Sequence, residues 1–370
     1  MSIGAIKRAI ISGGGTGGHI FPALSIADTL LKRYPDVEIL FIGADGRMEM
    51  SRVPDAGYQI KGLPVEGLRR KQIWKNFGVL KNFFVSLVMA RDIIRQFKPD
   101  VVVGVGGYAS APTLKAAQSL GVPTLIQEQN SYAGLTNKFL SRRADCICVA
   151  YPQMERFFPK DKIVLTGNPI RPQIEFPQHF DRAEALRYFG LPEGTEHIVL
   201  VVGGSLGALT INESIGLQLE QWRAAGITLI WQTGVSYQDK ARELIASYKA
   251  PIYTNAFIDR MDLAYGLANV VISRAGAGSI SEICLLGKPS VLVPSPNVAE
   301  DHQTKNALAL SNRGAAILIA DRDARRALTP RTIELVKDEV MCASLHREAL
   351  KLAQGRAAEK IVDELEKLIR

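Results

Sequence analysis

Two stretches of the chain repeat one pattern and decide the fold. Residues 9–24 read AIISGGGTGGHIFPAL, and residues 198–213 read IVLVVGGSLGALTINE. Each stretch begins with an apolar run, passes through a glycine cluster and continues with helical periodicity. A buried strand, a glycine turn and a helix in this order form the first half of a β-α-β unit. We therefore expect two domains of the same general type.

Apolar runs of strand length recur along the whole chain. In the first half they cover 9–12, 37–43, 100–105, 123–127, 145–149 and 162–166, and in the second half 197–202, 227–231, 270–273, 290–294 and 316–320. Most are continuous rather than alternating, which is typical of parallel strands covered by helices on both faces. Their alternation with helical segments predicts an α/β fold with two doubly wound parallel sheets.

The proline-rich stretch 166–182 has little periodicity and suits a linker, so we place the domain boundary near residue 170. Helical periodicity runs from Thr332 to the C-terminus. The last apolar stripe of this segment consists of Ile361, Val362, Leu365 and Leu368.

Composition sets broad limits on the function. Of 370 residues, 47% are hydrophobic and 22% are charged, so the chain is expected to fold rather than to be disordered. The net charge of +8 favours anionic partners. Cys146 and Cys148 lie on one face of a predicted strand without further soft ligands nearby, so we expect neither a disulfide framework nor a metal site. No apolar run is long enough to span a membrane, and any membrane contact is expected to be peripheral.

Four glycine clusters follow predicted strands, at 13–19, 104–110, 203–207 and 273–282. Glycines let a backbone approach a phosphate whose charge is met by the amides of a helix N-terminus. A tight turn without a ligand is the alternative for any single cluster. Four clusters at the carboxyl ends of strands, in two domains, predict a phosphorylated ligand held between the domains.

Several polar residues near these clusters have both a structural and a chemical interpretation. His19 and Glu128 are candidates for a general base, whereas Asn130 suits a helix N-cap. Glu282 is either the capping-box partner of Ser279 or an acceptor for ribose hydroxyls. The segment 301–306, DHQTKN, suits sugar hydroxyls or a solvated loop. The single D-x-D, Asp321 to Asp323, is interpreted as a surface loop, so a metal-bridged diphosphate is not indicated.

A basic segment with helical spacing covers Leu68–Phe84 and contains no acidic residue. Its cations are Arg69, Arg70, Lys71, Lys75 and Lys81, and its apolar stripe is Ile73, Phe77, Leu80, Phe84 and Leu87, with Trp74 beside it. Such a surface suits docking on anionic lipid, and a core-facing helix with a basic end is the alternative.

The motifs together resemble those of the MurG family of glycosyltransferases. In order they are GGGTGGH (13–19), GVGGYAS (104–110), QEQN (127–130), TGNPIR (166–171), VVGGSLGA (201–208), AFID (256–259), SRAGAGSISE (273–282) and DHQTKNA (301–307). The resemblance covers essentially the whole chain, and eight ordered motifs are far more specific than one glycine loop.

The resemblance implies a GT-B fold, with two Rossmann-like domains facing each other across a cleft. Residues 1–170, joined by the C-terminal helix 350–370, would take the lipid acceptor, and residues 171–349 the UDP-sugar donor. The implied reaction is the inverting transfer of N-acetylglucosamine from UDP-N-acetylglucosamine to the 4-hydroxyl of undecaprenyl-pyrophosphoryl-N-acetylmuramoyl pentapeptide. The resemblance implies no cofactor, metal or nucleic-acid partner. It also implies that the protein binds peripherally to an anionic membrane surface, at the cytoplasmic face of the bacterial inner membrane.

The resemblance also implies roles for individual residues. Thr16, Gly17 and Gly18 would contact the donor, with Asn130 near the sugar and Tyr108 among the substrate contacts. Arg171 and the backbone of Ile258 would address the uracil, Ser205 the phosphates, and His302 and Gln303 the sugar hydroxyls. The turn that would hold the diphosphate and ribose consists of Ala277, Gly278, Ser279, Ile280, Ser281 and Glu282.

Membrane docking, on this interpretation, involves the basic segment. Catalysis needs a base for the acceptor hydroxyl, with His19 the first candidate and Glu128 the second. A sugar-nucleotide epimerase of the same fold, a nicotinamide oxidoreductase and a membrane-associated nucleotide sensor are the alternatives. The epimerase would leave the basic segment unexplained. The oxidoreductase would leave the glycine loops of the second domain without a role, and the sensor would predict no turnover.

Overall fold

The computed structural model describes residues 5–67, 76–175, 180–204, 207–248, 251–298 and 301–369. By its internal contacts the chain divides into two compact units. The first contains Met1–Arg171 and Arg356–Arg370, and the second contains Pro172–Gly355. The chain therefore passes from one unit to the other between Arg171 and Pro172 and returns between Gly355 and Arg356, so residues 350–355 belong to the second unit.

The first unit is built on a parallel sheet, whose described strands follow the order β3-β2-β1-β4-β5-β6-β7. The strands are β1 (Arg8–Ser12), β2 (Glu38–Ala44), β3 (Gln59–Leu63), β4 (Val101–Gly104), β5 (Thr124–Glu128), β6 (Cys146–Val149) and β7 (Ile163–Leu165). The helices are α1 (Gly17–Arg33), α2 (Glu49–Asp55), α3 (Asn76–Phe97), α4 (Ser110–Ser119), α5 (Leu135–Leu140) and α16 (Ala357–Leu368), with 3-10 turns at Met154–Arg156 and Lys160–Lys162.

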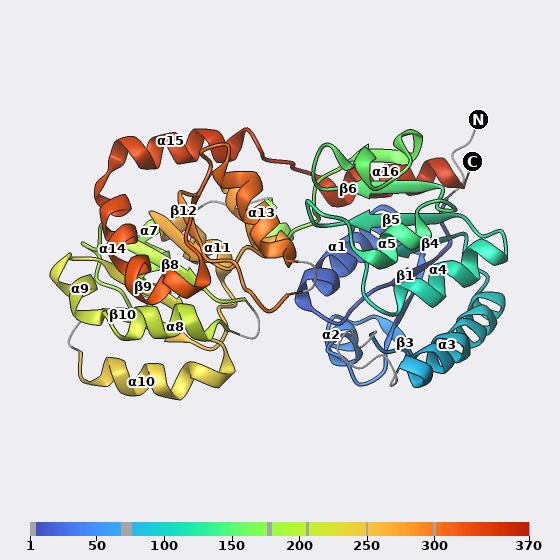
Figure 1. Ribbon diagram of the computed structural model, residues 1–370, viewed down its shortest axis with the longest axis horizontal. Coiled ribbons are helices and arrows are strands. Elements are labelled where there is room, and N and C mark those ends of the chain that lie inside the picture. The colour runs from blue at the N-terminus through green and yellow to red at the C-terminus, as the bar shows by residue number, and fades with distance from the viewer. Residues whose placement is uncertain are drawn as a thin grey trace. The chain divides into compact units, whose positions relative to one another are not determined.

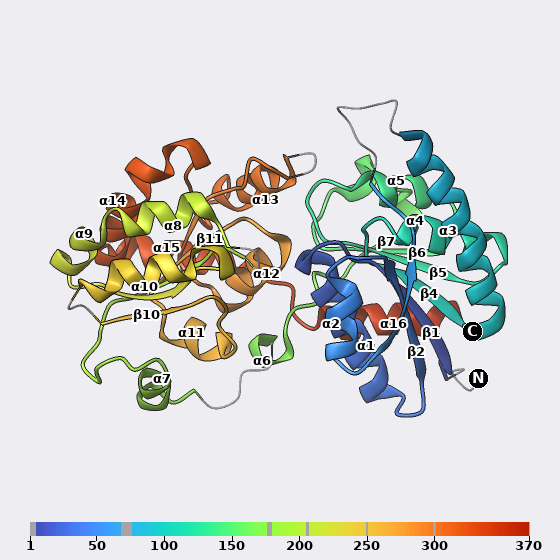
Figure 2. The same ribbon diagram turned by 90° about the horizontal axis from the view of Figure 1, so that it is seen from below.

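Helices cover both faces of this sheet, and Figure 2 shows them on its two sides. Side chains of α3, α4 and α5 pack with Ile10, Ile42 and Val102 in one apolar cluster. Side chains of α1 and α16 pack with Ile11 and Val103, which point to the opposite face, in a second cluster. The continuous apolar strands predicted from the sequence are explained by this double coverage.

The second unit repeats the plan with the strand order β10-β9-β8-β11-β12-β13, again all parallel among the described residues. The strands are β8 (Ile198–Val202), β9 (Thr228–Gln232), β10 (Ile252–Asn255), β11 (Val270–Ser273), β12 (Ser290–Leu292) and β13 (Ile317–Leu318). The helices are α6 (Pro172–Glu175), α7 (Arg182–Tyr188), α8 (Leu209–Gly216), α9 (Leu219–Ala224), α10 (Gln238–Ala246), α11 (Met261–Leu267), α12 (Ala277–Leu286), α13 (His302–Ser311), α14 (Ala324–Lys337) and α15 (Glu339–Leu350), with 3-10 turns at Val235–Tyr237 and Asp321–Asp323.

Strand order reverses once in each sheet, between β1 and β4 and between β8 and β11. At such a switch point the two following loops diverge to opposite faces, and ligands of open α/β sheets bind in the space between them. The prediction of two doubly wound parallel sheets is confirmed. The edge strands β3 and β10 were missed, because neither is a continuous buried run.

The C-terminal helix α16 packs against α1, far from it in sequence, and lies among the blue and green elements of the first unit in Figure 1. Ile361, Val362 and Leu365 are fully buried in the cluster that they share with α1. The apolar stripe expected at the end of the chain is thus the contact face of this helix.

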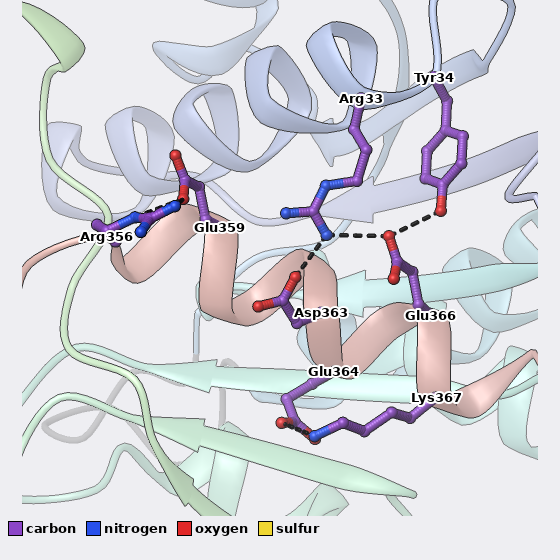
Figure 3. A network of polar contacts seen from close by, with 8 residues as sticks. All are labelled: Arg33, Tyr34, Arg356, Glu359, Asp363, Glu364, Glu366 and Lys367. Carbon is purple, nitrogen blue, oxygen red and sulfur yellow. Dashed lines mark hydrogen bonds and ion pairs between the residues drawn. The ribbon is translucent and has the colours of Figure 1, made fainter. Parts of the chain in front are cut away.

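Figure 3 shows the polar contacts of α16, which include Arg33 and Tyr34 at the end of α1. The Arg33 guanidinium lies 2.5 Å from Asp363 and 2.9 Å from Glu366, and the Tyr34 hydroxyl donates to Glu366 at 2.7 Å. Burial, together with this hydrogen bond, raises the pKa of Tyr34 to about 12, so the phenol remains a donor at neutral pH.

We expect the apolar side chains to hold α16 in place more strongly than the ion pairs do. Leu365→Ala should destabilise the helix contact by about 2–4 kcal/mol through a lost buried side chain and a cavity. Arg33→Ala should cost about 1 kcal/mol or less, because its ion pairs are partly exposed to solvent. Native-state hydrogen exchange of the α16 amides measures both. A larger loss of protection in Arg33→Ala than in Leu365→Ala would contradict this order.

Candidate active site

Two glycine loops of the first unit interlock at the switch point between β1 and β4. A Cβ atom on Gly13 would lie 2.2 Å from Cγ2 of Val105, and one on Gly107 would lie 2.5 Å from the carbonyl oxygen of Gly14. Both distances are far below van der Waals contact, so a side chain at either position would force the loops apart. The Ser110 hydroxyl lies 2.8 Å from the carbonyl oxygens of Ser12 and Gly106 and fastens α4 to both loops.

His19, in the first turn of α1, is held by this pair of loops. Its Nδ1 lies 3.0 Å from the carbonyl oxygen of Gly14 and 3.4 Å from Oγ1 of Thr16. A carbonyl only accepts hydrogen bonds, so Nδ1 carries the hydrogen, and in the neutral ring Nε2 carries the lone pair. A Cβ atom on Gly106 would lie 2.9 Å from Nε2, so the ring packs against the Gly106 backbone. This tautomer is the one suited to accept a proton at Nε2.

The start of α1 presents backbone amides beside His19. Thr16 precedes the helix in an extended conformation, and its carbonyl accepts the N–H groups of His19 and Ile20. The first turn of an α-helix leaves its leading N–H groups without partners inside the helix, and here that turn carries no acidic side chain. Gly17 and Gly18 add no bulk to this turn, so the arrangement suits an anionic group.

Glu128, at the end of β5, is buried and surrounded by N–H donors. One carboxylate oxygen accepts the backbone and side-chain N–H groups of Asn130 at 3.0 and 3.2 Å. The other accepts the Gly134 backbone at 3.0 Å and the Asn137 side chain at 2.8 Å. Burial raises the pKa of Glu128, although these four hydrogen bonds oppose the rise. A raised pKa suits a base, but both oxygens are engaged in shaping their own loop.

A network of amide side chains, which the sequence showed only as motif letters, joins the carboxyl ends of neighbouring strands. The Gln129 amide donates to the Val105 carbonyl at 2.6 Å and thereby joins the loops after β5 and β4. The Gln127 side chain donates to Oδ1 of Asn168 at 3.0 Å, and the Asn168 side chain in turn donates to the backbone carbonyl of Gln129 at 3.0 Å. Asn130 lies in this same loop and not at a helix start, because α5 begins at Leu135.

Tyr108 and Arg171, which are predicted to contact the substrate, each make a contact that involves an aromatic ring in the first unit. Tyr108 is partly exposed, and its ring lies against Gly67, whose Cβ atom would be 2.3 Å from Cζ of the phenol. The Arg171 guanidinium lies over the Phe21 ring, 5.9 Å from its centroid. Phe21 is two residues beyond His19, so Arg171 belongs to the same end of α1.

In the second unit, α12 begins at Ala277, inside the fourth glycine cluster. Gly276 is the N-cap, without a side-chain hydrogen bond, and no acidic residue lies in the first turn. Of the two interpretations of Glu282, the capping box with Ser279 is therefore wrong, since Ser279 lies inside the helix. The leading N–H groups of Ala277, Gly278 and Ser279 are those that such a helix leaves for an anion.

Glu282 is buried one turn further along α12 and accepts the Tyr265 hydroxyl at 3.0 Å. Ile280 is buried too, and the Ser281 hydroxyl donates back to the Ala277 carbonyl at 2.9 Å. Hence Glu282 and Ser281 both make contacts within the unit, and the first backbone amides of α12 suit an anionic ligand.

The other residues predicted to contact the UDP-sugar lie in segments that follow strands of the second unit. The Ile258 backbone N–H donates to Oε1 of Gln232 at 3.1 Å, so a nucleobase contact through that N–H would require Gln232 to move. Oε1 of Gln303 accepts the Ser295 N–H at 2.8 Å, which directs the amide NH₂ of Gln303 elsewhere. His302 is the first residue of α13, next to Gln303 in the sequence, and is partly buried.

The D-x-D sequence lies at the surface as expected, with an exposed Arg322, but Asp321 is partly buried and is not simply solvated. Asp321 forms a 2.5 Å ion pair with Arg274 and accepts the Thr210 hydroxyl at 3.1 Å. Arg274 also donates to the carbonyls of Val293 and Pro294. Asp321 thus ties together the segments after β11, β12 and β13. Among the described residues, no group of three or more histidine, cysteine or acidic side chains is placed to hold a metal ion.

Part of the predicted site lies outside the described residues: Ser205, Arg69, Arg70, Lys71, Ile73, Trp74 and Lys75. Phe77 lies in the first turn of α3, while Leu80 and Lys81 are exposed further along it. Over the described ranges, no helix is long and apolar enough to cross a membrane.

Known proteins resemble this chain over nearly its whole length. The glycosyltransferase family 28 N-terminal domain matches residues 9–149, and the family 28 C-terminal domain matches residues 198–365. A Porphyromonas gingivalis protein named UDP-N-acetylglucosamine–N-acetylmuramyl-(pentapeptide) pyrophosphoryl-undecaprenol N-acetylglucosamine transferase is 59% identical, covering 98% of this chain and 96% of its own length.

Solved structures give the same result. The crystal structure of Acinetobacter baumannii MurG has a TM-score of 0.74 and 29% identity, covering 98% of this chain and 99% of that one. A UDP-N-acetylglucosamine 2-epimerase, at 14% identity and a TM-score of 0.63 with 97% and 95% covered, shares the fold alone. The resemblance found in the motifs is thus confirmed: the chain belongs to the MurG family of glycosyltransferases, within glycosyltransferase family 28.

Proposed function

We propose that this protein transfers N-acetylglucosamine from UDP-N-acetylglucosamine to undecaprenyl-pyrophosphoryl-N-acetylmuramoyl pentapeptide, converting lipid I to lipid II. The observation that carries this function is the 59% identity to a transferase of that name over nearly the full length of both chains. The epimerase alternative has only the shared fold in its support.

His19 is the general base in this proposal. The acceptor 4-hydroxyl attacks the anomeric carbon, the new C–O bond forms as the bond to the UDP phosphate breaks, and the hydroxyl proton passes to Nε2. A single displacement inverts the α-linked donor to a β-linked product. The interlocked loops support this role, because they fix the ring with the hydrogen on Nδ1 and the lone pair on Nε2.

The second unit takes the donor in this proposal. The first-turn amides of α12, at Ala277 to Ser279, face the charge that develops on the departing diphosphate. Glu282 accepts the ribose hydroxyls, while Ser205, Gln303 and His302 assist with phosphates and sugar. Thr16, Gly17, Gly18, Asn130 and Tyr108 bind from the first unit, and Arg171 and Ile258 address the uracil.

The function is tested by following radiolabelled UDP-N-acetylglucosamine in the presence and absence of the lipid-linked acceptor. Wild type should move label into lipid only when the acceptor is present, and His19→Ala should lower kcat by about 10²–10⁴-fold with little change in donor affinity. No acceptor-dependent transfer, or label in an epimer, would contradict the function. An unchanged kcat in His19→Ala would exclude His19 as the base.

Glu128 is a loop organiser in this proposal and not the base. Glu128→Gln replaces one acceptor oxygen by an NH₂ group that faces N–H donors. We expect this to destabilise the protein by about 2–4 kcal/mol and to lower kcat, because two buried N–H groups lose their partner.

The pH profile of kcat/KM distinguishes a loop-organising role of Glu128 from a role as the general base. The acidic limb of kcat/KM should persist in Glu128→Gln at nearly its wild-type position, because His19 still titrates there. A profile that loses its acidic limb in Glu128→Gln, but keeps it in His19→Ala, would make Glu128 the base.

We further propose that the first unit docks on the cytoplasmic face of the cell membrane. Along α3, Leu80, Phe84 and Val88 recur every four residues and are 53%, 57% and 61% exposed. Leu80 and Phe84 belong to the predicted stripe, whereas its last member, Leu87, packs against the core. On the same face of the sheet, α5 exposes Phe139, beneath the ammonium of Lys115. A hollow beside it is lined by Lys115, Gln118, Lys138, Phe139, Arg142 and Arg143. Exposed apolar side chains, together with the cations that line the hollow at Phe139, suit anionic lipid.

Replacing Leu80, Phe84 and Val88 together by serine should reduce binding to phosphatidylglycerol-containing vesicles by tenfold or more, since each side chain loses apolar burial in the lipid. Vesicle co-sedimentation measures the effect. Val340→Ser, at a position 81% exposed on α15, is the matched control and should bind like wild type. Equal binding by the triple variant and the control would exclude this face as the docking surface.

A further inference from the structure

A buried carboxyl group with no role in the family motifs lies behind the first glycine loop. Glu49, at the start of α2, is 1% exposed. Oε2 accepts the N–H of Gly15 at 2.8 Å, and Oε1 accepts the N–H of Ala44, at the end of β2, at 3.0 Å. Both oxygens are therefore directed at backbone amides and not at solvent.

The absence of side chains at two glycines makes room for this carboxyl group. A Cβ atom on Gly14 would lie 2.1 Å from Cδ and Oε1 of Glu49, and one on Gly43 would lie 2.6 Å from its Cγ. Gly14 has a φ of 152° and Gly15 a φ of 86°, so the loop bends sharply around the carboxyl group. The loop and the Glu49 side chain therefore fit each other as one unit.

The bond that Glu49 forms leads directly to His19. The Gly15 N–H and the Gly14 C=O belong to the same peptide group. Glu49 accepts from the N–H of that peptide, and the His19 Nδ1–H donates to its C=O at 3.0 Å. Hydrogen bonds at the two ends of one amide polarise it in the same direction and strengthen each other. We propose that Glu49 is a positioning residue for catalysis, which orients His19 and increases its basicity through the Gly14–Gly15 peptide.

Other charged groups at this edge of the sheet are placed differently. Asp45, after β2, lies against Gly62 of the edge strand β3 and is exposed, as is Arg47. Glu128, at the end of β5, is engaged by the N–H donors of the loop that follows it. The contacts described above for the His19 ring come from the uncharged Gly14, Thr16 and Gly106. Glu49 is thus joined to the ring through the Gly14–Gly15 peptide by a continuous path of hydrogen bonds.

The test compares Glu49→Gln with Glu49→Asp. The inference rests on the proposed role of His19, so the His19 imidazole is titrated by NMR in the intact protein, independently of activity; His19→Ala identifies its signal among the five histidines. Removing the charge in Glu49→Gln should lower the imidazole pKa by about one unit. The acidic limb of kcat/KM should move to lower pH by the same amount, and kcat should fall by tenfold or more with the donor KM nearly unchanged. Glu49→Asp should retain most of the wild-type titration.

A matched control separates this effect from general loss of structure. Asp100 accepts the backbone N–H groups of Lys7 and Arg8 at 2.8 Å, at the opposite end of the same sheet. Asp100→Asn should leave the imidazole titration and the pH profile unchanged. If His19 titrates in Glu49→Gln as in wild type, or if Gln and Asp variants lose activity equally without a shift, Glu49 only supports the fold and the inference is wrong. If the imidazole shifts but His19→Ala remains active, the role of His19 fails and the coupling to Glu49 stands.

Discussion

The close approach of two glycine loops at one switch point is the constraint on which the first unit depends. Gly13 against Val105, and Gly107 against Gly14, leave no space for a side chain at the point where strand order reverses. The loops could not meet here with any other residue at these positions. Their contact fixes the Gly14 carbonyl, and through that carbonyl it fixes the tautomer of His19.

Two buried carboxyl groups organise loops at the strand ends of the first unit, and a third joins helices α11 and α12 of the second unit. Glu49 and Glu128 accept backbone and amide N–H groups, and Glu282 accepts the Tyr265 hydroxyl. A carboxyl group near a glycine loop in a sequence invites a catalytic interpretation. Burying a carboxyl group without hydrogen-bond donors would cost free energy. The donors around each carboxyl group therefore indicate a structural role, which has to be considered before a catalytic one.

The sequence predicted both sheets, because buried parallel strands leave continuous apolar runs such as Val101–Gly104. It missed β3 and β10, which lie at sheet edges, where half-exposed strands lose that pattern. The position of His19 beside a glycine loop was predictable from the motif. The importance of Glu49 was not, because its partners at Gly15 and Ala44 are backbone groups that leave no trace in residue type. Asp321 was misjudged for a similar reason, since its partner Arg274 lies 47 residues away.

The proposed role of His19 depends most directly on which nitrogen of its ring carries the hydrogen. Nitrogen-15 NMR of the wild-type protein, with ring nitrogens labelled and His19 assigned by comparison with His19→Ala, reports which nitrogen carries the hydrogen. Above the imidazole pKa, the structure predicts a protonated Nδ1 and an unprotonated Nε2. A neutral ring with its hydrogen on Nε2 would leave no lone pair on Nε2 to accept the acceptor proton, and would contradict the proposed role of His19.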